Sequence, residues 1–208
     1  MLKEKRREQV LLRATEIFSE KGYYSTNVSD IIEKAGIARG TFYLYFQSKR
    51  QVFDSIIDTL LKEIDLRLKP IALEPGSPPP LEQLQENATR VLTYLLDNRQ
   101  LTQILLQHAE GLDQECDEKL DGFYQKLADM IGSSLKHGIT MGLVRQCNTR
   151  LTAYSIIGLV KEVIRQLISS DEDIADLDEV GEELLKFGLL GVLLTVPPHY
   201  RWIKGESK

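Results

Sequence analysis

Residues 26–49 read TNVSDIIEKAGIARGTFYLYFQSK, and this stretch decides the fold of the first part of the chain. Apolar residues at helical spacing predict a short helix over residues 28–35. Gly36 is expected to end it, because glycine enters the left-handed conformation that a helix stop requires without a steric penalty. A second short helix is predicted over residues 39–46. Two short helices around such a turn form a helix-turn-helix motif, here residues 28–47.

This helix pair is too small to bury a core of its own and needs support from neighbouring helices. A first helix is expected over residues 4–21, where apolar residues recur at helical spacing before Gly22. Ser48 and Gln51 have the spacing of a capping box, which predicts that a long helix begins there. Both supports are present, so the second short helix is predicted to protrude.

The second short helix has the composition of a DNA recognition helix. Phe42 and Phe46 are four residues apart and are expected to face inward, which leaves polar and aromatic side chains outside. Arginine, threonine and tyrosine can donate hydrogen bonds to phosphate oxygens, arginine can also read guanine, and glycine lets the backbone come close to the duplex. The candidate DNA-binding residues are Thr26, Asn27, Arg39, Gly40, Thr41, Tyr43, Leu44, Tyr45 and Lys49. Taken singly, each of these residues is better explained as core or as a solvated side chain, so the complete pattern carries the interpretation.

This segment resembles the DNA-binding domain of the tetracycline-repressor (TetR) family of bacterial transcriptional regulators. The family pattern is met by Thr26, Val28, Asp30, Ile31, Ala35, Gly36, Gly40, Thr41, Tyr43, Tyr45, Phe46 and Lys49. The resemblance covers roughly residues 5–65, and the rest of the chain is similar only in length, helical pattern and order of parts. Two positions depart from the pattern: Ala38 replaces a capping serine, and Ile32 replaces a small residue. The loss of the cap predicts a recognition helix that orders fully only on DNA.

The distribution of charge along the chain indicates that only the N-terminal part binds nucleic acid. Residues 1–50 contain ten Lys and Arg against six Asp and Glu, whereas the other residues contain sixteen against twenty-five. A basic first part on an acidic remainder predicts that only the first part meets a polyanion.

The composition also narrows the class of protein. With 42% hydrophobic and 27% charged residues, the 208-residue chain is typical of a globular protein with a real core. No apolar run reaches the roughly 18 residues of a membrane span, and the charged N-terminus does not read as a secretory signal. Cys116 and Cys147 lie far apart without metal-type spacing, so we expect neither a disulfide scaffold nor a metal site, and a cytoplasmic location.

The remainder of the chain is also predicted to be helical. After a proline-rich break at residues 69–80, helices are expected near 81–97, 99–109, 113–137, 149–169 and 176–195. The fold class is therefore all-α. An N-terminal three-helix helix-turn-helix domain over residues 1–65 is joined by a long helix to a helical ligand-binding and dimerisation domain over residues 66–208.

The last two helices are the candidate dimer interface. Residues 151–168 are apolar over about half of the helix circumference, which is more than one core-facing stripe requires. In the resembled family the corresponding helices form a four-helix interface between two subunits. The candidate interface residues are Ile156, Val160, Ile164, Gly181, Leu184, Gly188, Gly191 and Val192. Thick packing within one subunit is the alternative.

A small-molecule effector site is expected in the helical remainder, because the resembled family couples a ligand there to the spacing of its two DNA readers. An apolar face with a few polar groups fits an apolar or amphipathic organic molecule. The candidate ligand-binding residues are Tyr94, Gln103, His108, Phe123, Tyr124, Leu127 and Met130. For each of them ordinary core packing is the competing interpretation. No cofactor is expected.

Enzyme motifs were not found: the chain has no phosphate-binding glycine loop, no G-x-S-x-G and no H-E-x-x-H. The sequence therefore predicts a homodimeric repressor that binds a palindromic double-stranded DNA operator and is released by a small, largely apolar effector, with no membrane partner. The alternative is a helical interaction or ligand-sequestering protein that binds nucleic acid only nonspecifically.

Overall fold

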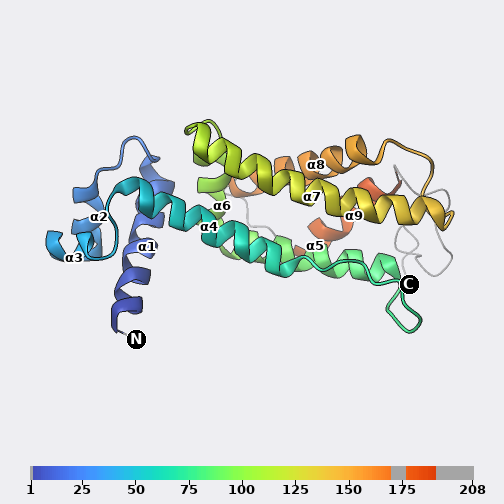
Figure 1. Cartoon of the computed structure of the whole chain (residues 1–208), viewed down its shortest axis with the longest axis horizontal. Coiled ribbons are helices and arrows are strands. Elements are labelled where there is room, and N and C mark those ends of the chain that lie inside the picture. Colours follow the sequence, from blue (N-terminus) through green and yellow to red (C-terminus); the bar gives the residue numbers. More distant parts are fainter. Residues whose placement is uncertain (1, 170–176, 191–208) are drawn as a thin grey trace. The chain divides into compact units, whose positions relative to one another are not determined.

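The computed structural model describes residues 2–169 and 177–190, and every regular element in these ranges is a helix (Figure 1). The elements are α1 (Leu2–Lys21), α2 (Val28–Ala35), α3 (Arg39–Tyr43), α4 (Lys49–Arg67), α5 (Pro80–Asp97), α6 (Arg99–Gln103), the π-helix η1 (Ile104–Ala109), α7 (Gln114–Thr140), α8 (Thr149–Ser169) and α9 (Leu177–Leu190). The all-α class with an N-terminal helix-turn-helix is confirmed.

The chain forms two compact units. The head unit contains residues 1–66 together with Tyr94–Leu120, and the body unit contains Arg67–Thr93 with residues 121–208. Helix α7 begins in the head unit and continues in the body unit. The structural head is therefore larger than the helix-turn-helix region, because it includes α6, η1 and the first residues of α7.

The core of the head unit is aromatic. Phe18, Phe42, Phe46 and Phe53 are almost completely buried. The rings of Phe18 and Phe53 meet edge to face with centroids 5.6 Å apart, a favoured aromatic geometry. Phe18 belongs to α1, Phe42 to α3 and Phe53 to α4, and Phe46 follows α3, so these side chains hold the reader region against α1 and α4.

The turn between α2 and α3 has the predicted chemistry. Gly36 adopts φ 61° and ψ 39°, and its N–H donates to the carbonyl oxygen of Glu33. The N–H of Ile37 donates to the carbonyl oxygen of Ile32 at 3.3 Å. These bonds satisfy carbonyls that the end of a helix leaves without partners.

Helix α3 is shorter than predicted. It covers Arg39–Tyr43, residues 44 and 45 continue as a turn, and the Phe46 N–H donates to the Phe42 carbonyl at 3.0 Å. Its N-cap, Ala38, makes no side-chain capping bond. One of the two hydrogen bonds of the predicted capping box at the start of α4 is present: the Gln51 N–H donates to Ser48 Oγ at 3.2 Å.

The region expected to be one helix over residues 99–109 is α6 followed by the π-helix η1. Within the described ranges, no helix combines the length and apolar character needed to cross a bilayer.

Candidate nucleic-acid interface

Helix α3 presents a polar and aromatic surface. Phe42 and Phe46 face inward as predicted, while Arg39 and Gly40 are exposed. Leu44 is 75% exposed and Tyr43 46% exposed. The side chains of Thr41 and Tyr45 are half-buried. Its two aromatic anchors are buried, so these side chains make up the outer surface of the helix and the turn after it.

Arg39 and Tyr43 form a pair on this surface. The guanidinium carbon of Arg39 lies 5.9 Å from the centre of the Tyr43 ring, within the range of a cation–π contact. An exposed arginine next to an aromatic face is well suited to meet a phosphate or the edge of a base.

Asn27 is exposed at the start of α2, and its N–H donates to the carboxylate of Asp30 at 3.0 Å. Thr26 does not share this exposure. Its side chain is completely buried and its Oγ1 donates to the Gly22 carbonyl at 2.8 Å. The hydroxyl closes the turn after α1, so this side chain is not part of the exposed surface, and a contact of Thr26 with DNA stays a prediction.

Lys49, the first residue of α4, contacts the same turn. Its Nζ donates to the carbonyl oxygens of Tyr23 and Thr26, each at 2.6 Å. Burial lowers the pKa of Lys49, and the charge of Asp30 opposes this only in part. The turn between α1 and α2 leaves carbonyls without helical partners, and this ammonium satisfies two of them. These bonds hold the half-buried side chain against the turn, and its contact with a phosphate stays a prediction.

The sequence analysis missed an ionic cluster centred on Arg50, which lies at the start of α4. Its Nε donates to both carboxylate oxygens of Asp54 at 2.9 Å, and Nη1 pairs with Asp113 just before α7. Burial alone would lower the pKa of Arg50, but the hydrogen bond to Asp54 and the nearby negative charges raise it. Only the pair Arg50–Asp54 has a spacing that the sequence reveals, since Asp113 lies far along the chain.

Two predicted ligand-binding residues face the end of α1 in the head unit. Gln103 Nε2 donates to the Ser19 carbonyl at 3.3 Å. His108 lies beside Gly22, where an added Cβ would be 3.6 Å from its Cε1. Burial lowers the pKa of His108. These polar groups are engaged in packing against α1.

The remaining ligand candidates divide between the units. Tyr94 belongs to the head unit, whereas Phe123, Tyr124, Leu127 and Met130 lie half-buried on α7 in the body unit. Lys161 Nζ lies 5.1 Å from the centre of the Tyr124 ring. The predicted set therefore does not form a single site within either unit.

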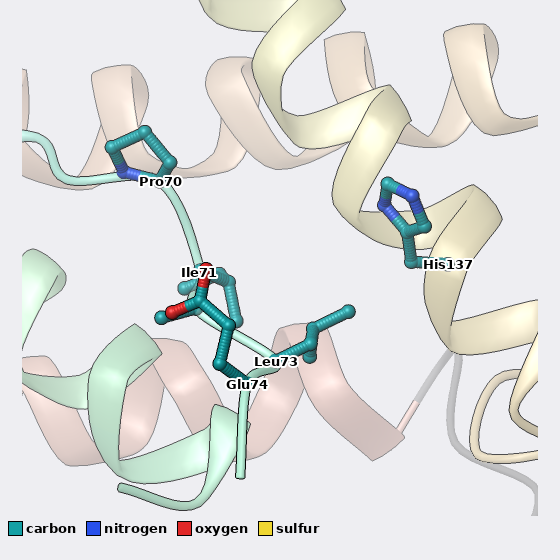
Figure 2. A pocket seen from close by; sticks show the side chains of 6 residues that line it. Pro70, Ile71, Leu73, Glu74 and His137 are labelled. Atoms are coloured by element: carbon teal, nitrogen blue, oxygen red, sulfur yellow. The ribbon is translucent and has the colours of Figure 1, made fainter. Parts of the chain in front are cut away.

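The body unit has a hollow at another place, of about 500 Å³. Figure 2 shows it between the segment that follows α4 and His137 on α7. Its lining is mostly apolar, with Glu74 and His137 as polar groups: Pro70, Ile71, Ala72, Leu73, Glu74 and His137. None of the predicted ligand residues lines it. Across the described residues, no group of three or more His, Cys, Asp and Glu side chains is arranged to hold a metal ion.

Two of the candidate interface residues are core residues of one subunit. Ile164 is 2% exposed. Gly181 is buried, and a Cβ added to it would lie 3.4 Å from Leu92 Cδ1. Both pack within their own chain, and their place in a dimer interface stays a prediction. Ile156, Val160, Leu184 and Gly188 are half-buried, and Gly191 and Val192 lie outside the described residues.

The sequence analysis missed large apolar side chains that α8 and α9 leave open. Phe187 is 72% exposed, Leu151 66% and Tyr154 38%. Phe187 follows Leu184 by three residues and so lies on a neighbouring position of the same helix face. That spacing was visible in the sequence as part of the α9 pattern.

Comparison with known proteins agrees with this geometry. The family model of bacterial regulatory proteins of the tetR family matches residues 10–56. The model of the tetracyclin repressor-like C-terminal domain matches residues 77–165. Together they cover the helix-turn-helix and much of the remaining helical chain.

Individual proteins are similar over most of their length. The uncharacterized HTH-type transcriptional regulator YhgD of Bacillus subtilis is 29% identical over 158 residues, which are 74% of this chain and 80% of the relative. The structure of NalD, the secondary repressor of the MexAB-OprM multidrug efflux pump in Pseudomonas aeruginosa, has a TM-score of 0.74 at 24% identity, covering 93% of this chain and 98% of that one. The regulator FadR of Bacillus subtilis in complex with stearoyl-CoA has a TM-score of 0.72 at 22% identity, covering 88% and 98%. With both family models matched in order along its helices, the chain belongs to the tetR family of bacterial transcriptional regulators.

Proposed function

We propose that this protein is a homodimeric, sequence-specific repressor that binds a palindromic operator and is released by a small, largely apolar effector. The observation that carries the proposal is the geometry of α3. Two buried phenylalanines anchor the helix, and Arg39, Gly40, Tyr43 and Leu44 are left exposed on it. The basic first part of the chain adds favourable electrostatics toward DNA.

Dimerisation follows from the small size of the reader. One five-residue helix contacts few base pairs, whereas two copies bound to successive major grooves about 34–36 Å apart multiply affinity and require a palindrome. The open apolar side chains Leu151 and Tyr154 on α8 and Phe187 on α9 support an interface on these helices, since exposed large apolar groups are common at binding surfaces. Ile156, Val160, Leu184 and Gly188 remain part of this proposal.

The effector is proposed to be apolar or amphipathic. FadR of Bacillus subtilis was solved with stearoyl-CoA, a molecule with a long apolar chain. In this chain, Phe123, Tyr124, Leu127 and Met130 give α7 a half-buried apolar face in the body unit. Such a face, with few polar groups, favours a ligand of the same character. We place the protein in the cytoplasm, where it would meet both DNA and effector.

Footprinting on genomic fragments tests the proposal. Protection of one palindromic segment by the wild-type protein is the expected result. Uniform coverage of all fragments would instead support the alternative of a helical interaction protein with nonspecific nucleic-acid binding. The effector is tested on the protected segment by adding fatty acyl-CoA thioesters of increasing chain length. We expect the protection to weaken as the apolar chain lengthens.

A further inference from the structure

The Arg50 cluster links the start of α4 to the start of α7 within the head unit. We call residues 39–46 the reader segment. Arg50 is the second residue of α4 and follows Phe46, the last residue of the reader segment, by four positions. Its side chain is 22% exposed. The guanidinium pairs with Asp54 on its own helix and with Asp113, and Glu115 Oε2 lies 3.8 Å from Nη2.

Asp113 has two roles in this cluster. Its Oδ1 accepts the N–H of Cys116 at 2.9 Å, which makes it the side-chain N-cap of α7, while its Oδ2 pairs with Arg50. The cap geometry of α7 and the position of the Arg50 guanidinium are therefore set by one carboxylate.

Lys119 adds a second link, in which α7 provides the cation and α4 the carboxylates. Its Nζ lies 2.7 Å from Asp58 and 3.8 Å from Asp54, so a cation from α7 meets two carboxylates of α4. Charges of both signs thus cross between the two helices. A network that lies partly out of water holds its geometry more tightly than a single exposed pair.

One polar atom of the cluster is unsatisfied. Arg50 Nη2 is buried and has no hydrogen-bond partner, although Glu115 is close. A buried donor without a partner costs free energy, so this atom adds nothing to the stability of the network.

We propose that Arg50 is a positioning residue for DNA reading: it ties the start of α4, which directly follows the reader segment in the chain, to the start of α7. This inference rests on the proposed function, since it assumes two readers that must match an operator. Arg50 itself does not need to touch DNA. Its role is to set how rigidly each reader is held, and therefore how strictly the dimer selects the spacing between two half-sites.

The test compares binding to DNA with a single half-site and to full operators whose half-sites are at the natural spacing or one base pair closer or farther. Asp113→Asn is the principal variant, because asparagine can still cap α7 but has no charge for Arg50. Arg50→Gln removes the other partner, and Arg50→Lys keeps the charge. Arg13→Gln is the matched control, since it breaks a 2.6 Å ion pair with Glu16 that lies within α1 alone.

We expect Asp113→Asn and Arg50→Gln to leave half-site affinity within about twofold of wild type and to lower affinity at the natural spacing by about tenfold, in the range of typical coupling energies. The preference for the natural spacing should shrink in both, recover partly in Arg50→Lys and persist in Arg13→Gln. A spacing profile like that of wild type in Asp113→Asn would overturn the inference, as would an equal loss on half-site and full operator. If wild type itself selects no operator, the proposed function fails instead.

Discussion

The ammonium of Lys49 lies 4.2 Å from the centre of the Tyr23 ring and donates a 2.6 Å hydrogen bond to the main-chain carbonyl of the same residue. A second bond reaches the carbonyl of Thr26. The first residue of α4 thus closes the turn between α1 and α2, and it does so with a side chain that belongs to the family's DNA-binding pattern.

Lys49→Met is therefore expected to destabilise the head unit by about 1–3 kcal/mol, because it leaves two carbonyls without this donor. Chemical denaturation measures the change, and Lys62→Met at an exposed position of α4 is the control. The opposite pattern would restore the phosphate role: unchanged stability, weaker binding to all DNA sequences and a salt slope smaller by about one.

Gly36→Ala is expected to cost about 1–2 kcal/mol of stability, since Gly36 has φ +61° and open space around its Cβ position, so that backbone strain is the main effect. Gly40→Ala is the matched control, because Gly40 also has open space but lies in α3 without a positive φ. Alanine should stabilise that helix by up to about 1 kcal/mol while weakening DNA binding. Equal melting temperatures for the two variants would contradict this account of Gly36.

The features predicted well from sequence are those set by local rules. Helix α2 has the predicted bounds, Gly36 forms the expected turn, and Phe42 and Phe46 point inward. Each depends on side chains or backbone groups within a few residues, so spacing and conformational preference decide the outcome.

The sequence says less about which way a side chain points, because its tertiary partners decide this. A basic residue at a helix start predicts a phosphate contact for Lys49, but the nearest unsatisfied groups are carbonyls of the preceding turn. Ile164 is on an apolar arc, and only its packing shows which edge of the arc faces the core. The pair of Arg50 with Asp113 joins residues too distant for any spacing rule to connect.

Tyr43→Ala is expected to weaken operator binding about tenfold, within the range of one good base or phosphate contact. The stability of the fold should change little, because the ring is 46% exposed. Fluorescence anisotropy on operator DNA and thermal denaturation provide the two measurements, with Leu12→Ala on α1 as an exposed control. Unchanged operator affinity would remove Tyr43 from the contact surface.

The stability of the protein is expected to fall as the pH drops below about 6.5, the ordinary pKa of histidine. Burial lowers the pKa of His108, so the unfolded chain binds a proton more readily than the folded one. The contribution of neutral His108 to the free energy of unfolding is complete above the pKa of histidine in the unfolded chain. It is lost progressively as the pH falls from that value toward the lower pKa of the folded state. Urea titrations between pH 5 and pH 8 should show this slope in wild type and a smaller slope in His108→Gln. An identical slope in both would exclude His108 as its source.

Phe187→Asp is expected to convert the proposed dimer into monomers. The ring is 72% exposed on α9, and a large aromatic group in contact with a partner commonly contributes about 2 kcal/mol or more to association. That loss raises the dimer dissociation constant about thirtyfold, before the additional cost of burying a carboxylate.

Leu12→Asp places the same charge at a position that is 56% exposed on α1 and should leave the dimer intact. Sedimentation over a range of concentrations distinguishes the two. If Phe187→Asp and Gly188→Glu both remain dimeric, the subunits meet through a surface other than this face of α9. A charged side chain without a partner at the centre of a desolvated interface would cost several kcal/mol of association.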